Sequence, residues 1–167
     1  MENQEEQEFL PDSKSTVLDA HNDIISQHQA VQSLGKGFIA GLVAAIIGAI
    51  LWGLITSATG YKIGYAAIGI GFIVGFAIRV VGRGIDMSFS YMGAGLALFG
   101  CLFGNILAIA FIVQTQASLT FGETMSLVYN PTFIQAALTE GFDPIDLLFY
   151  GIAAYEGFKF SRIDLYA

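Results

Sequence analysis

The sequence predicts an all-α membrane protein with four transmembrane helices in two antiparallel hairpins. Hydrophobic residues make up 54% of the 167 residues and charged residues only 13%, which is too apolar for an ordinary soluble domain of this size. Four apolar runs follow one another along the chain, and a four-span arrangement places nearly all basic residues on one side of the membrane. The expected surroundings of the chain are therefore a lipid bilayer.

The chain begins with an acidic segment, residues 1–36, which we predict to be a cytoplasmic tail. Half of the 14 acidic residues lie in it: Glu2, Glu5, Glu6, Glu8, Asp12, Asp19 and Asp23. Such a start is typical of neither a signal peptide nor a transit peptide, so we expect the mature protein to keep it. No basic patch is present that could neutralise phosphates, which argues against nucleic acid as a partner.

The second half of the tail has the spacing of an amphipathic helix. Val17, Ile24 and Val31 recur every seven residues, and His21 and His28 follow the first two by four residues. This pattern predicts a helix that lies on the membrane or pairs with a partner helix. The two imidazoles would lie about 10.5 Å apart along the helix axis, which is too far to share one zinc ion.

The transmembrane domain, residues 37–162, contains four runs that we predict to cross the bilayer: 38–57, 63–81, 92–113 and 144–160. The first three match the roughly 20 residues that a helix needs to cross the hydrocarbon core. The fourth would cover about 25 Å, which a slightly thinner bilayer accommodates. Only short connections separate the first three runs, so each of these helices should return antiparallel to the one before it.

The basic residues predict how these spans are oriented. Six of the seven lie on one side of a four-span protein, with Lys62 on the other: Lys14, Lys36, Arg79, Arg83, Lys159 and Arg162. Basic flanks are retained on the cytoplasmic side. We therefore expect the cytoplasmic (inner) membrane, with the tail and the C-terminal residues 163–167 both in the cytoplasm.

Residues 114–143 would then form a loop on the outer face, and their sequence predicts two short helices. Thr120 and Glu123 have the spacing of a capping box. Asn130 and Pro131 suit the N-cap and first helical position of the second helix, and Gly141 would follow its end. We expect these helices to lie flat on the membrane or to cover the bundle, with a binding loop as the alternative.

Small residues recur at steps of four along the first three runs, in the manner of the GxxxG pattern. Helices in lipid associate by close packing, which needs small residues at the contact. We expect helix packing to depend on the following residues: Gly41, Ala45, Gly64, Gly71, Gly75, Gly100 and Gly104. Gly60 belongs to the same pattern in the second run. The spacing leaves open whether the contacts form within one chain or between chains.

Two stretches of the spans, "YKIGYAAIGIGFIVGFAIR" and "AAYEGFKF", carry a resemblance to a family of small bacterial multi-pass proteins of about four spans, which has no established activity. The resemblance covers the spans and not the tail. It implies a multi-span helical fold and a membrane location, and no reaction.

A short internal repeat is also visible. The segment "GIGFIVGF" from Gly69 aligns with "GIAAYEGF" from Gly151, and Glu156 is then the counterpart of Val74. Two similar hairpins in parallel orientation would explain the alignment, as in the parallel repeats of some transporters. A chance match in a glycine-rich sequence is the alternative.

The candidates for a polar site in the membrane are Glu156, Arg79, Lys159 and Asn105. A charge at the bilayer centre costs about 2.5–3.5 kcal/mol, but Glu156 lies four residues from the end of its run, within reach of headgroups. We expect it to neutralise Arg79, Lys159 or Arg162, with proton or cation handling and partner binding as alternatives. Asn105 should hydrogen-bond between helices or to water, with a substrate or water pathway as the alternative.

Acidic residues also gather before the fourth run, at Glu140, Asp143 and Asp146. They could form a cation site, but Asp143 and Asp146 occupy the cap and third positions of a helix that starts with Pro144, where acceptors and negative charge are favoured. We expect capping. The single cysteine, Cys101, lies inside an apolar run, and we expect a buried thiol.

The sequence contains no histidine cluster in the spans, no Ser-His or Cys-His pair within them and no phosphate-binding loop. We therefore expect no cofactor, no metal and no enzyme activity. The predicted function is that of a structural or accessory subunit of a membrane assembly, with itself or another membrane subunit, formed through glycine contacts. The alternative is a small oligomeric transporter or channel with Glu156, Asn105 and Arg79 along its path.

Overall fold

The computed structural model describes residues 13–60, 64–139, 141 and 143–163. Within them the chain forms seven helices and no strand, which confirms the all-α class. The helices are α1 (Ser13–Val31), α2 (Leu34–Thr59), α3 (Tyr65–Gly82), α4 (Met87–Ala117), α5 (Phe121–Val128), α6 (Pro131–Thr139) and α7 (Pro144–Phe160). The chain divides into two compact units, Met1–Val31 and Gln32–Ala167.

The first unit is described through α1, which covers the predicted tail helix. Val17, Leu18 and Ile24 are exposed on it, and His21 is half-buried. The side chain of His28 lies outside the described residues. Helix formation in the tail is confirmed, whereas docking on a membrane or a partner helix stays a prediction.

Three helices of the described part, α2, α3 and α4, are long and apolar enough to cross a membrane. By length and composition the chain is thus compatible with a multi-pass membrane protein. The helix α7 has 17 residues and the same bounds, 144–160, as the fourth predicted run.

The first and third predicted runs were too short as helices, whereas the second, 63–81, agrees with α3 to within two residues at each end. Helix α4 has 31 residues, about 46 Å at 1.5 Å per residue, and extends past the predicted 92–113 run at both ends. Helix α2 begins at Leu34, after the N-cap Ser33, whose hydroxyl accepts a hydrogen bond from the Lys36 backbone at 3.4 Å. Hydropathy marks only the apolar part of a helix, whereas backbone hydrogen bonding continues into polar residues such as Gln114.

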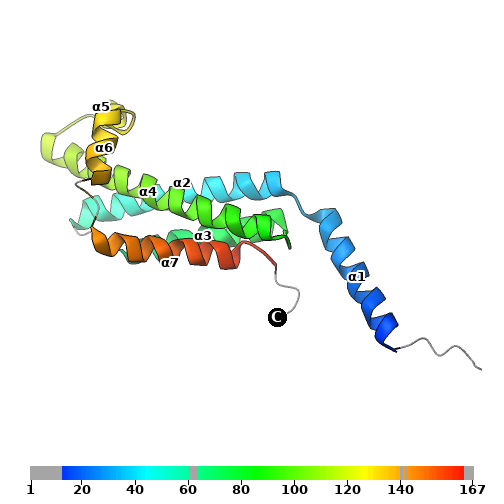
Figure 1. The fold of residues 1–167 in the computed structure, drawn as a ribbon. Helices are drawn as coiled ribbons and strands as arrows, with labels where there is room; N and C mark the ends of the chain where they lie inside the picture. The colour runs from blue at the N-terminus through cyan, green and yellow to red at the C-terminus, as the bar shows by residue number, and fades with distance from the viewer. Residues whose placement is uncertain (1–12, 61–63, 140, 142, 164–167) are drawn as a thin grey trace, which may run out of the picture. The chain divides into compact units, whose positions relative to one another are not determined.

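Helices α2, α3, α4 and α7 form a bundle (Figure 1), in which α3 and α4 contact each other and each contacts both α2 and α7. Helices α2 and α4 run in the same direction, because Gly100 meets Ala45 and Gly104 meets Ala49. Helices α2 and α3 run in opposite directions, because Gly37 lies beside Gly82 at one end and Gly48 beside Ile70 further along.

The bundle has two ends that differ in construction. At the α3–α4 end, residues 83–86 join these two helices. The Ser33 backbone donates a hydrogen bond to the Gly82 carbonyl at 2.8 Å, and the Ile163 backbone donates one to the Gly84 carbonyl, also at 2.8 Å. Gln32 adds two more, to Asp86 at 2.5 Å and from the Ile85 backbone at 3.2 Å. The segments that enter α2 and leave α7 therefore hold this loop.

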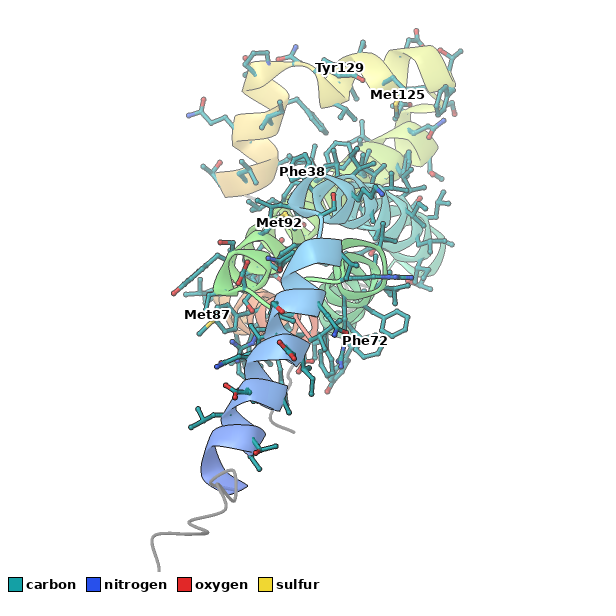
Figure 2. The ribbon with its side chains drawn as sticks, turned by 90° about the vertical axis from the view of Figure 1, so that its right-hand side faces the viewer. Phe38, Phe72, Met87, Met92, Met125 and Tyr129 are labelled. Carbon is teal, nitrogen blue, oxygen red and sulfur yellow. The ribbon has the colours of Figure 1, made fainter. Side chains whose placement is uncertain are left out.

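Two short helices lie at the other end, which we call the α5–α6 end, and both pack against α4. Figure 2 shows Met125 and Tyr129 on this part of the chain. The predicted capping box is present: the Thr120 backbone and hydroxyl donate hydrogen bonds to Glu123 at 2.8 and 2.7 Å, and the Glu123 backbone donates to the Thr120 hydroxyl at 3.4 Å. Asn130 caps α6 by accepting from the Thr132 backbone at 2.9 Å. Both short helices are confirmed.

Candidate functional site

The seven residues on which we expected helix packing to depend lie at contacts within the bundle. For each glycine, we describe how close the neighbouring helix lies by the distance from a Cβ atom, added to the glycine, to the nearest atoms of that helix. At Gly100 these include the side chain of Ala45 at 3.2 Å, and at Gly104 they include the backbone of Ala49 at 3.3 Å. Gly41, Gly64, Gly71 and Gly75 have similar close neighbours on other helices, and Ala45 is fully buried. In this structure the contacts form within one chain.

The two segments of the internal repeat lie side by side. An added Cβ at Gly71 would meet the Ala153 Cα at 2.8 Å, and one at Gly75 would meet the Gly157 carbonyl oxygen at 3.3 Å. Both pairs are 82 residues apart, the same offset that aligns Gly69 with Gly151. Equivalent positions of α3 and α7 therefore face each other in two parallel helices.

The sequence pattern was wrong at one position and incomplete at another. Gly60 does not pack a helix: it is the C-cap of α2 with φ 70°, a left-handed conformation that glycine adopts without strain. Gly157 of α7 was missed, although an added Cβ there would meet the Gly93 carbonyl carbon of α4 at 3.0 Å. The four-residue spacing of Ala153 and Gly157 was the available signal.

Within the described part of the chain, no ion pair of Glu156 with Arg79 or Lys159 is present, and Glu156 and Arg79 are both half-buried. Neutralisation of Glu156 by Arg162 stays a prediction. The Lys159 ammonium instead lies 5.7 Å from the ring centroids of Tyr155 and Phe160. The methylene groups of a lysine pack along apolar surface, and its ammonium group is attracted to the faces of aromatic rings.

Basic residues nevertheless gather at the α3–α4 end. Lys36 starts α2 there, Arg79 and Arg83 end α3, and Lys159 and Arg162 end α7. Arg162 donates a hydrogen bond to the Met87 sulfur at 3.1 Å. Lys62 lies outside the described residues.

The acidic residues before α7 act as helix caps. Asp146 accepts a hydrogen bond from the Asp143 backbone at 3.0 Å, as a capping box requires. Glu140 lies outside the described residues. No group of three or more His, Cys, Asp or Glu that could hold a metal ion occurs in the described part of the chain.

The most unusual polar feature is a group of three buried side chains, Trp52 of α2, Asn105 of α4 and Tyr150 of α7, which we call the polar cluster. Their exposed fractions are 2%, 0% and 5%. The rings of Trp52 and Tyr150 meet edge to face, with centroids 6.3 Å apart. The Tyr150 hydroxyl donates a hydrogen bond to the Cys101 carbonyl at 3.3 Å, one helical turn before Asn105.

Two members of this cluster have polar atoms without a partner. The side-chain nitrogen and oxygen of Asn105 and the indole nitrogen of Trp52 form no hydrogen bond within the described chain. The expected interhelical hydrogen bond of Asn105 is therefore not formed. Sequence analysis missed Trp52 and Tyr150, because each counts as apolar in a hydropathy pattern while carrying one polar atom.

The geometry offers one polar cluster inside the bundle and one basic end, with close helix packing between them. No family model, curated protein or solved structure matches this chain.

Proposed function

We propose that the chain is a non-enzymatic four-span protein of the cytoplasmic membrane that serves as a structural or accessory subunit of a membrane assembly. The observation that carries this proposal is the division of the span glycines: those such as Gly41 and Gly104 pack helices within one chain, whereas three others meet no atom of this chain. The first set of glycines is buried inside the bundle, so a partner would contact the remaining surface.

The fourth span follows from the packing of α7. This helix lies along both α3 and α4 and is parallel to α3, which supports the proposal that α7 crosses the bilayer together with them. The five basic residues at the α3–α4 end favour placing that end in the cytoplasm, together with both termini. The α5–α6 end then lies on the outer face.

The surface that remains for a partner includes three glycines on the spans. Gly69 of α3, Gly95 of α4 and Gly151 of α7 have no atom within 4 Å of an added Cβ. Another membrane helix can approach closely at such positions. A homo-oligomer or a second membrane subunit would therefore contact this chain at glycines that the bundle itself does not use.

A small oligomeric transporter or channel is the second candidate. It is favoured by the partnerless polar atoms of Asn105 and Trp52 inside the bundle, since intramembrane polar groups often line pathways. Glu156 and Arg79 are half-buried near the basic end and would lie further along such a path.

Cross-linking in native membranes separates the two candidates. Single cysteines replace Gly69, Gly95 or Gly151 in a chain with Cys101→Ser, and Val43→Cys on the exposed face of α2 is the control. We expect one discrete cross-linked species from at least one glycine position, none from the control, and no ion flux in vesicles that contain the purified protein. Absence of discrete products, together with flux that Asn105→Leu or Glu156→Gln abolishes, would favour the transporter.

A further inference from the structure

We propose that the polar cluster binds water inside the bundle, with the Asn105 amide and the Trp52 indole N–H as its main contacts. The site would be closed off from lipid by α2, α4 and α7, and the proposal does not depend on the function proposed above.

Burying the polar atoms of Asn105 and Trp52 without hydrogen bonds would cost free energy. A buried amide or N–H group without a hydrogen bond costs roughly 2–7 kcal/mol relative to water, depending on the reference state. Asn105 contributes two such atoms and Trp52 one. Total protein stability is commonly only about 5–15 kcal/mol. A bundle that left all three atoms unsatisfied would lose much of its stability.

The other buried polar groups differ from these atoms, because they are able to find a partner on their own helix. Thr56 and Ser90 also lack a partner, but a helical hydroxyl reaches the carbonyl four residues earlier after a simple rotation. Thr59, Thr115 and Thr139 form that bond in this structure, at 2.8, 3.0 and 2.9 Å. The indole nitrogen of Trp52 has no such route to its own helix, and the Asn105 amide has donors and an acceptor to satisfy together. Asn105 and Trp52 therefore need an outside partner.

The donors and the acceptor of Asn105 and Trp52 match the hydrogen bonds that a water molecule forms. The Trp52 N–H and the Asn105 NH₂ are donors, and the Asn105 oxygen is an acceptor. The Tyr150 hydroxyl donates to the Cys101 carbonyl. A single water accepts two hydrogen bonds and donates two, and buried waters in proteins typically form about three.

The neutral character of the cluster argues against an ion. None of the three side chains carries a charge, and an ion taken from water without a compensating charge has a desolvation cost of several kcal/mol. Asp146 lies one turn before Tyr150 on α7 but is already used as a helix cap. Water satisfies the donors and the acceptor without this cost.

Radiolytic footprinting of the full chain in lipid nanodiscs tests the proposal. Hydroxyl radicals formed from a bound water modify the side chains beside it even where bulk solvent has no access. We expect modification of Trp52 well above that of Phe89, which is equally buried at 2% but has no polar atom in its side chain, after correction for intrinsic reactivity. Equal corrected modification of the two residues would overturn the proposal.

Two variants sharpen the test. Asn105→Leu removes the main water contact and should abolish the modification of Trp52, whereas Ser90→Ala, at an equally buried position of α4, should leave it unchanged. Thermal unfolding gives an independent measurement. A dry site predicts that Asn105→Leu raises the unfolding temperature, because it removes an unsatisfied group, and that result would also overturn the proposal. If Asn105→Leu fails to fold, the comparison of Trp52 with Phe89 in the unchanged chain still decides.

Discussion

The two ends of the bundle hold their helices together by different means. At the α3–α4 end backbones meet directly, as at Gly93 and Gly157, and backbone hydrogen bonds hold the loop. At the α5–α6 end the rings of Trp52 and Tyr150 fill the space between helices. A clash between two backbones is not relieved by a change of rotamer, whereas a clash with a side chain is often relieved in this way. Substitutions should therefore be costly at the first end and better tolerated at the second.

The largest effect is expected for Phe89→Ala. The Phe89 ring lies over a slot made of three glycines, where an added Cβ at Gly37 or Gly82 would meet it at 3.2 or 2.8 Å. The three glycines have no side chains of their own that could move in to fill a cavity. We expect a loss of about 3–5 kcal/mol in the free energy of unfolding, measured by steric trapping in bicelles.

Phe72→Ala is the matched control for that prediction. Phe72 projects from the bundle surface (Figure 2) and is 46% exposed, so its removal leaves no cavity. An equal loss for both variants would show that the α3–α4 end is not held by its glycine slot.

The next effect in size is expected for Gly93→Ala. An added Cβ would clash with the Gly157 carbonyl and the Ser161 side chain of α7, so the two helices must separate. We expect a loss of about 1–3 kcal/mol in the free energy of unfolding. Gly95→Ala, two residues further on the same helix, meets no atom within 4 Å and should change stability little. Two similar values would contradict a close contact between α4 and α7.

Gly104→Ala tests the more tolerant end. Its Cβ would meet a ring carbon of Trp52 at 2.9 Å and the Ala49 Cα at 3.3 Å. Because the indole ring is able to shift, we expect a loss of about 1 kcal/mol or less, at the lower end of typical overpacking costs. The measurement is again the free energy of unfolding. A larger loss than for Gly93→Ala would reverse the proposed difference between the two ends.

Local and periodic features of this structure were readable from the sequence. The capping box of Thr120 and Glu123 depends on residues three apart, and α7 begins and ends where its run of apolar residues does. The packing glycines were readable because contact between membrane helices has few solutions other than small residues at steps of four.

Features that depend on which helices are neighbours were not readable. The glycine slot of Phe89 combines residues from α2, α3, the 83–86 loop and α4, and no spacing along one segment indicates it. The partner expected for Glu156 was chosen from charge alone, and the structure places Lys159 along aromatic rings instead. Trp52 and Tyr150 were counted as apolar, so the polar cluster emerged only from their burial and from the Tyr150 hydrogen bond one turn before Asn105.

The smallest effect concerns the cap of α5. Hydrogen bonds from the Thr120 side chain and backbone lower the pKa of Glu123 below its ordinary value of 4.5. The folded state therefore favours the carboxylate, and the stability that it adds is fully present above pH 4.5 and is lost as the pH falls through the lowered pKa. Because Glu123 is exposed, the loss should be confined to local opening of α5. Amide hydrogen exchange, corrected for intrinsic rates, should show protection of α5 falling with pH while α6, capped by the non-titrating Asn130, keeps its protection. Glu123→Gln removes the titration and should remove the difference, so a pH response shared by both helices, or retained in the variant, would place its origin outside the cap.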